Sequence, residues 1–102
     1  MSGPGPDSPA GGLEAALAVV GQRWALLIVD RLRAAPLRYG DLQRELGIPT
    51  NILATRLREL EQAGVLYRLP LKHNTRAYAL TPRGLALGDA LDGLRQWGDG
   101  LT

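Results

Sequence analysis

Apolar residues recur along this chain first at helical spacing and later at strand spacing. Residues 13–20 follow the 3.6-residue period of a helix, and residues 24–35 are apolar on nearly every side until Pro36 ends the segment. These patterns predict a first short helix and a buried central helix. A short strand at residues 37–39 and a two-turn helix at residues 39–46 are expected next.

The clearest helical pattern lies at residues 50–63. Leu53, Leu57 and Leu60 form an apolar stripe at positions i, i+4 and i+7. Because a helix turns by about 100° per residue, its opposite face carries the polar side chains. We expect Thr50 to be the N-cap of this helix.

From residue 65 the period shortens toward two. Residues 65–69 and 76–80 are predicted to be strands, joined by a polar turn at residues 70–75. The turn carries cationic side chains, so the sequence predicts a hairpin with a basic tip.

The last predicted helix begins at Thr81 and Pro82, a pair typical of an N-cap and a first turn. Apolar side chains seven residues apart give it a stripe, namely Leu80, Leu87, Leu94 and Leu101, with Leu91 and Trp97 alongside. Its glycines each weaken a helix by about 1 kcal/mol relative to alanine. We therefore expect this helix to depend on packing against another surface.

The chain of 102 residues is long enough for one small domain. Residues 1–12 include three Pro and four Gly and little to bury, so we expect a disordered tail there. Residues 13–102 are expected to form the folded domain.

Composition and charge exclude several classes of function. The sequence has no Cys and one His, which excludes a structural zinc site, a thiol nucleophile and a thiol switch, and we expect no metal or cofactor. It also lacks a catalytic carboxylate pair, a Ser-His-Asp arrangement and a phosphate-binding loop, so we do not expect an enzyme. No apolar run approaches the roughly 18 residues that cross a bilayer, and no signal peptide is visible. We expect a cytoplasmic protein without a membrane partner.

The order of the elements is typical of a winged helix-turn-helix, a mainly α domain with a small β-hairpin (α+β). In that fold the helix at residues 50–63 enters the DNA major groove, and the wing at residues 70–76 lies on the backbone or minor groove. The middle of the chain, residues 36–76, carries seven cations against four anions, which favours a nucleic-acid partner.

Two groups of polar or small side chains are the candidates for DNA contact. The helix supplies Thr50, Asn51, Ala54, Thr55, Arg56 and Arg58, and the hairpin supplies Arg68, Lys72, His73, Asn74 and Arg76. An alternative is that the helix presents a solvated face of charge pairs, because Glu59 and Glu61 alternate with its arginines. Which arginines contact bases and which contact phosphates stays open.

Four segments in order match one family. Residues 19–29 resemble its "lxGgKWtlLIl" signature, and residues 39–44 resemble "F-x-E-L-x-R". Residues 53–66 resemble "L-t-x-R-L-r-e-L…G-l-v", and residues 78–84 resemble "Y-x-L-T-p-x-G". The family is HxlR, a group of bacterial winged-helix transcriptional regulators related to the MarR type, and the resemblance covers roughly residues 13–98.

The resemblance implies a homodimer built on the first and last helices, which binds a palindromic double-stranded DNA operator with one recognition helix per half-site. The dimerisation candidates are the apolar side chains of these helices: Leu13, Leu17, Leu87, Leu91, Leu94 and Trp97. The alternative is that the last helix packs within its own chain. Such a regulator is commonly a repressor and is associated with the nucleoid when bound. Some members of the family sense thiol chemistry, which the lack of Cys excludes here.

Large apolar side chains in a cleft between the dimerisation part and the DNA-binding part of such a molecule could hold a small aromatic effector. The candidates are Trp24, Leu27, Tyr39 and Trp97, for which a plain core role is the alternative. A rival function is a winged helix that has become a small-molecule-binding or catalytic protein. Salt distinguishes the two, because DNA affinity falls steeply as the salt concentration rises.

Overall fold

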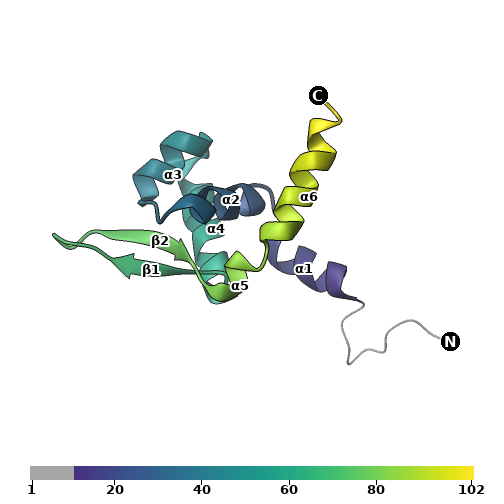
Figure 1. Ribbon diagram of the computed structural model, residues 1–102. Coiled ribbons are helices and arrows are strands. Elements are labelled where there is room, and N and C mark those ends of the chain that lie inside the picture. Colours follow the sequence, from purple (N-terminus) through teal and green to yellow (C-terminus); the bar gives the residue numbers. More distant parts are fainter. Residues whose placement is uncertain (1–10) are drawn as a thin grey trace.

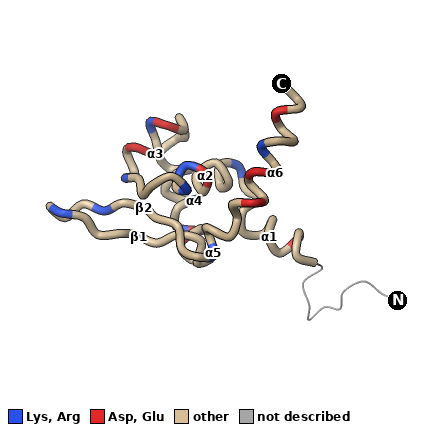
Figure 2. Tube along the Cα trace, viewed as in Figure 1, with Lys and Arg blue, Asp and Glu red and all other residues tan. Residues whose placement is uncertain are grey.

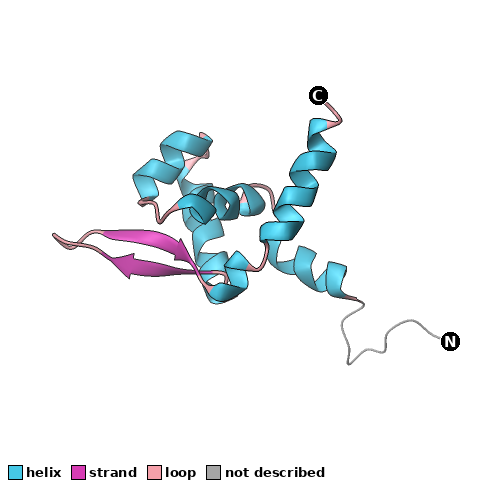
Figure 3. Ribbon diagram, in the orientation of Figure 1, coloured by secondary structure: helices cyan, strands magenta, loops and turns pink. Residues whose placement is uncertain are grey.

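The computed structural model describes residues 11–102, and most of the expected disordered tail, residues 1–10, lies outside this range. Gly12, which the sequence placed in the tail, is instead the first residue of α1. The elements are α1 (Gly12–Val20), α2 (Ala25–Ala34), α3 (Tyr39–Leu46), α4 (Thr50–Gln62), β1 (Leu66–Pro70), β2 (Arg76–Leu80), α5 (Pro82–Leu85) and α6 (Gly88–Asp99). The hairpin projects from one side of the helical core, and α1 and α6 project from the other (Figures 1 and 3).

The core is built on the predicted leucine stripe of α4. Leu53, Leu57 and Leu60 are at most 2% exposed, and they belong to the same buried cluster as Ile28 and Val29 of α2. Burial of each such side chain contributes about 1.5–3 kcal/mol. The polar face of α4 must therefore point away from the core.

The hairpin pairs as predicted, antiparallel, from Leu66 opposite Leu80 to Pro70 opposite Arg76. The expected strand at residues 37–39 is reduced to a single bridge between Leu37 and Tyr78, whose two backbone hydrogen bonds are 2.8 and 3.1 Å long. It extends no further because Arg38 is the N-cap of α3. The Arg38 backbone N–H donates to the Asp41 carboxylate at 3.3 Å, so the helix begins at Tyr39 and the strand cannot continue.

The prediction of a single last helix is wrong, because the structure divides this segment into α5 and α6. Thr81 is an N-cap as predicted, since its hydroxyl accepts a hydrogen bond from Gly84 N at 3.2 Å. Gly84 then lies so close to the hairpin that an added Cβ would stand 2.2 Å from Val65 O. With Leu80 in β2 and a break before Gly88, the leucines do not share one helix face.

Both α1 and α6 leave apolar side chains exposed. Leu13 is 73% exposed and Leu17 51% on α1, while Leu94 is 51% and Trp97 70% exposed on α6. Leu91 differs: at 6% exposure it is buried in its own chain, in the cluster that also includes residues of α2.

Within residues 11–102, no single helix has the length and apolar composition needed to cross a bilayer. The pair α1 and α2 reaches that length only when taken together, and the two helices are bent by 84°.

Candidate nucleic-acid interface

The outward face of α4 lies opposite its buried leucines. Asn51, Ala54 and Arg58 are exposed there, whereas Thr55 is half-buried. The Thr55 hydroxyl donates to Asn51 O at 3.0 Å, so it is already used inside the helix. Together with Gln62 at the end of the helix, the Asn51 amide and the Arg58 guanidinium are thus the polar groups that this face presents to solvent.

The start of α4 differs from the sequence prediction. The N-cap is Pro49, with φ at −58°, and Thr50 is already the first residue of the helix, with no side-chain cap hydrogen bond. The helix begins one residue early because α3 holds its first turn: the Tyr39 hydroxyl donates to Thr50 O at 2.5 Å. This bond joins the starts of α3 and α4, and no local pattern of residues indicates it.

The two arginines of α4 have different surroundings. The Arg56 side chain is only 19% exposed; its Nε donates to Arg23 O at 3.1 Å, and its Nη1 bonds to Glu59 at 2.8 Å. It therefore ties α4 to the corner between α1 and α2. Arg58 is exposed and has no hydrogen-bond or ion-pair partner within residues 11–102.

One arginine of the hairpin joins β1 to α4. Arg68 Nε bonds to the Glu61 carboxylate at 3.1 Å. Next to this pair is a cleft of about 290 Å³, lined by Tyr39, Ala54, Leu57, Arg58, Glu61, Arg68 and Tyr78. The structure thus brings candidates from the helix and from the hairpin to one surface. The sequence analysis missed Glu61 as a partner, although its alternation with arginines indicated charge pairing.

The remaining hairpin candidates lie at or next to the exposed tip. Lys72, His73, Asn74 and Arg76 are all exposed, and the tube in Figure 2 marks cationic positions at the far end of the hairpin. The turn itself is tight: the Thr75 hydroxyl donates to Lys72 O at 2.7 Å, and His73 and Asn74 have φ of 63° and 59°.

The four residues expected to line an effector pocket do not surround one cavity within residues 11–102 of a single chain. Tyr39 lines the cleft beside α4, whereas Leu27 lines a separate hollow of about 200 Å³ between α2 and α6. Trp24 lies at the corner before α2, where the Arg23 guanidinium is 5.2 Å from the centre of its ring. Trp97 is on the exposed part of α6.

Comparison with known proteins identifies relatives over nearly the whole described chain. The model of the HxlR-like helix-turn-helix family matches residues 19–102. The HTH-type transcriptional regulator Rv3095 of Mycobacterium tuberculosis is 42% identical over 86 residues, which cover 82% of this chain and 54% of the relative. The chain spans about half the length of this relative. The HTH-type transcriptional regulator YodB of Bacillus subtilis is 33% identical over 90 residues, or 85% of this chain and 80% of YodB.

Solved structures agree with the predicted winged-helix fold. The structure of PA1607 superposes with a TM-score of 0.83 at 37% identity, covering 88% of this chain and 64% of PA1607. The structure of quinone-bound YodB superposes with a TM-score of 0.75 at 32% identity, covering 86% and 94% of the two chains. The predicted fold and the predicted resemblance are both confirmed, and the relatives are transcription regulators rather than enzymes. The chain belongs to the HxlR-like helix-turn-helix family.

Proposed function

We propose that this protein is a transcriptional regulator, acting as a repressor, that binds a palindromic DNA operator as a homodimer. One observation carries the proposal: the face of α4 opposite the buried leucines exposes Asn51, Ala54 and Arg58 next to a hairpin with a cationic tip. An α-helix fits the major groove, and a wing beside it reaches the flanking backbone. A regulator of this kind works in the cytoplasm, on the nucleoid.

The side chains on α4 suit base edges. An Asn amide forms two hydrogen bonds with adenine, an Arg fork forms two with guanine, and an Ala methyl packs on the thymine methyl. Asn51, Arg58 and Ala54 are assigned these roles, with Thr50 and Thr55 beside them. Arg56 holds α4 in place through Arg23 O and contacts phosphate at most with its remaining N–H groups.

The hairpin supplies affinity that does not depend on sequence. Lys72 and Arg76 are the cations that neutralise phosphates, because each such contact releases counterions from DNA. His73 and Asn74 add hydrogen bonds at the tip, and Arg68 contacts the backbone from the middle of β1 while Glu61 fixes its position.

The homodimer is proposed from the apolar side chains that one chain leaves in water. Leu13 and Leu17 of α1 and Leu94 and Trp97 of α6 are each more than half exposed. A surface of this kind on a small domain marks a protein interface, and a two-fold axis lets both copies cover it together. Leu87, half-buried, lies at its edge, whereas Leu91 belongs to the core of its own chain.

The proposal includes a small aromatic effector that releases the protein from DNA. The support is the hollow of about 200 Å³ between α2 and α6, lined by Leu26, Leu27, Asp30, Leu91, Leu94 and Arg95, and the quinone held by the related YodB structure. A panel of quinones and other aromatic compounds tests it through Trp fluorescence and the melting temperature. No change with any compound would contradict this part of the proposal.

The test of DNA binding uses sheared genomic DNA, from which purified protein retains fragments for sequencing. We expect a palindromic motif with the wild type and none with the Asn51→Ala/Arg58→Ala variant. Arg83→Ala is the matched control, because it removes one exposed cation from α5 rather than from α4. Retention without a motif, or no retention, would contradict the proposal and favour the rival function of a small-molecule-binding or catalytic winged helix.

A further inference from the structure

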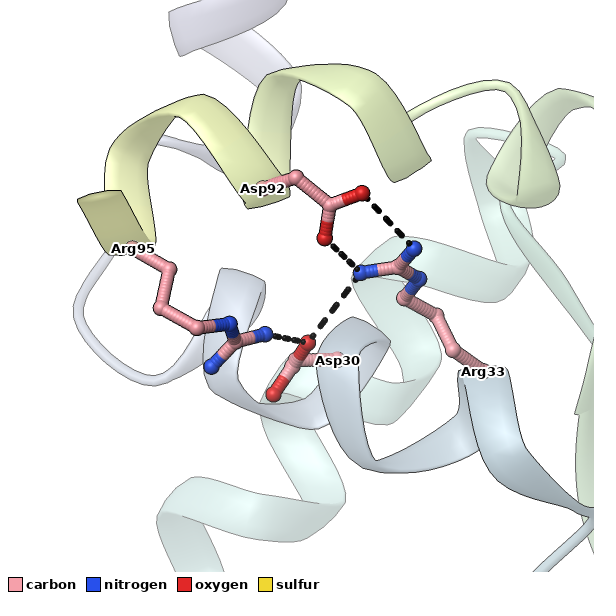
Figure 4. A network of polar contacts seen from close by, with 4 residues as sticks. All are labelled: Asp30, Arg33, Asp92 and Arg95. Atoms are coloured by element: carbon pink, nitrogen blue, oxygen red, sulfur yellow. Dashed lines mark hydrogen bonds and ion pairs between the residues drawn. The ribbon is translucent and has the colours of Figure 1, made fainter.

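Four charged side chains join α2 to α6, and the proposed DNA contacts use none of them. Arg33 donates to both oxygens of Asp92, at 2.8 and 3.3 Å, and its Nη1 is also 3.6 Å from Asp30. Arg95 Nη2 is 2.5 Å from the same Asp30 oxygen. Figure 4 shows the four side chains bridging the two helices, with Asp30 and Arg33 on α2 and Asp92 and Arg95 on α6.

The network attaches α6 at two points. On each helix the two charged residues are three positions apart, so they lie about 4.5 Å apart along the axis. Arg33 and Asp92 form one attachment and Asp30 and Arg95 the other. Two attachments fix the direction of a helix, whereas one contact leaves it free to swing.

Apolar packing alone holds α6 weakly. The helix is separated from α5 by a break before Gly88, and Leu91 is its one buried residue among residues 88–99. Gly88 lies beneath the network, since an added Cβ would stand 3.3 Å from Arg33 Nη2. The C-terminal end of α6 projects away from the core (Figure 1).

The charges of the central pair persist at neutral pH. The hydrogen bond from Arg33 holds the pKa of the Asp92 carboxyl below its usual value, and the hydrogen bond to Asp92 raises the pKa of Arg33. An aspartate with a lowered pKa loses its partner only in acid, below its ordinary pKa of about 4.

We propose that the network of Asp30, Arg33, Asp92 and Arg95 sets the direction of α6, and through it the distance between the two recognition helices and the half-site spacing that the dimer selects. The inference rests on the proposed function, because it needs the homodimer and its operator. The twelve residues of α6 make a lever about 18 Å long. A tilt of about 10° at its base moves its far end by about 3 Å, close to the roughly 3.4 Å rise of one base pair.

Such a network contributes little to the stability of the fold. Its effect on the geometry of the dimer can therefore be distinguished from an effect on the melting temperature. Its side chains are 19–53% exposed, and exposed ion pairs contribute little to folding. We therefore expect variants of the network to shift the melting temperature by less than about 5 °C while they change the geometry of the dimer.

The test reverses charges without changing the net charge. Asp92→Arg with Arg95→Asp makes both attachments repulsive. Adding Asp30→Arg and Arg33→Asp restores an opposite charge at each of them. Glu45→Gln is the control, because it breaks the Arg31–Glu45 pair between α2 and α3 and leaves α6 untouched.

Two measurements apply to each variant. The first is the affinity for operators whose half-sites are separated by a series of spacers. The second is the distance between spin labels on Gln62→Cys in the two subunits, which label one position per chain because the sequence has no other Cys. We expect the wild type and the fourfold variant to prefer one spacing by tenfold or more and to give one narrow distance distribution. The double variant should lose most of that preference and give a broad or shifted distribution.

The outcomes separate the inference from the proposed function. A double variant that keeps the wild-type spacing and distance overturns the inference and leaves the proposed function intact. A fourfold variant that behaves like the double variant also overturns the inference, because paired charges would then not suffice. If spin labels on Gln62→Cys in the otherwise wild-type protein give no distance between two subunits, both the homodimer and the inference are overturned.

Discussion

At the scale of single residues, the hairpin turn holds a side chain in an unfavourable conformation. His73 and Asn74 both have φ near +60°, the left-handed region, where Asn is tolerated better than His. Two consecutive residues of this kind are typical of the type I′ hairpin turn, whose preferred sequence is Asn-Gly. The histidine at this position therefore costs the fold some stability.

His73→Asn should raise the free energy of unfolding by about 0.5 kcal/mol, because Asn adopts the left-handed region with less strain. Urea unfolding followed by circular dichroism measures it. His73→Ala is the control, since it also removes the imidazole but lacks the short polar side chain that lets Asn adopt a positive φ. Equal stability of the two variants would contradict the strain argument.

Two glycines of the C-terminal third have opposite surroundings. At Gly84 a Cβ would meet Val65 O at 2.2 Å, whereas at Gly93 nothing lies within 4 Å. Gly84→Ala should therefore destabilise the fold by about 1–3 kcal/mol, and Gly93→Ala should stabilise it by up to about 1 kcal/mol through helix propensity. Thermal unfolding of both variants is the measurement. Stabilisation by both substitutions would contradict the close approach of α5 to the hairpin, and destabilisation by both would contradict the open surroundings of Gly93.

At the scale of elements, the sequence predicted well wherever one periodic face meets the core. The stripe of α4 and the alternation of the hairpin define elements that the structure reproduces to within about two residues at each end. Local patterns failed where a distant contact decides. Thr50 is not the N-cap of α4 because Tyr39, eleven residues earlier, holds the first turn.

The candidate site also combines features that a local pattern predicts with features that depend on distant contacts. The exposed face of α4 could be predicted, because it is the face opposite the leucines. The separate surroundings of Arg56 and Arg58 could not, since they depend on Arg23 O, a backbone atom 33 residues away. The network between α2 and α6 joins residues 59 and 65 positions apart, and no local pattern indicates such a pairing.

The exposed apolar side chains of α1 and α6 are predicted to hold the proposed homodimer together. Leu17→Asp on α1 or Trp97→Ser on α6 should convert the protein from about twice its chain mass of 11.0 kDa to the chain mass itself. Each change puts a polar group into the proposed apolar interface. Light scattering at micromolar concentration measures the mass. Tyr67→Ser is the control, because this exposed aromatic residue belongs to the hairpin, and it should leave the mass unchanged.

At the scale of the whole molecule, two surfaces lie on opposite sides of one small core. The hairpin projects from one side, and α1 and α6, which carry the exposed apolar side chains, project from the other (Figure 1). The helix α2 touches both parts, since it packs in the core beside α4 and carries Asp30 and Arg33 toward α6. A change at the proposed dimer surface can therefore reach the proposed DNA surface through a single helix.

The proposed base contacts of α4 and the proposed phosphate contacts of the hairpin predict two different effects on DNA binding. Lys72→Ala should weaken the affinity for every sequence alike and reduce the slope of log affinity against log salt by about 0.9, because one phosphate contact is lost. Arg58→Ala should cost about 1–3 kcal/mol on the operator and less on scrambled DNA, because it removes a base contact. Fluorescence anisotropy on both DNAs over a range of salt concentrations measures the two quantities. If Arg58→Ala weakened both DNAs equally, Arg58 would be a phosphate contact, and sequence reading would rest on Asn51 and the threonines of α4.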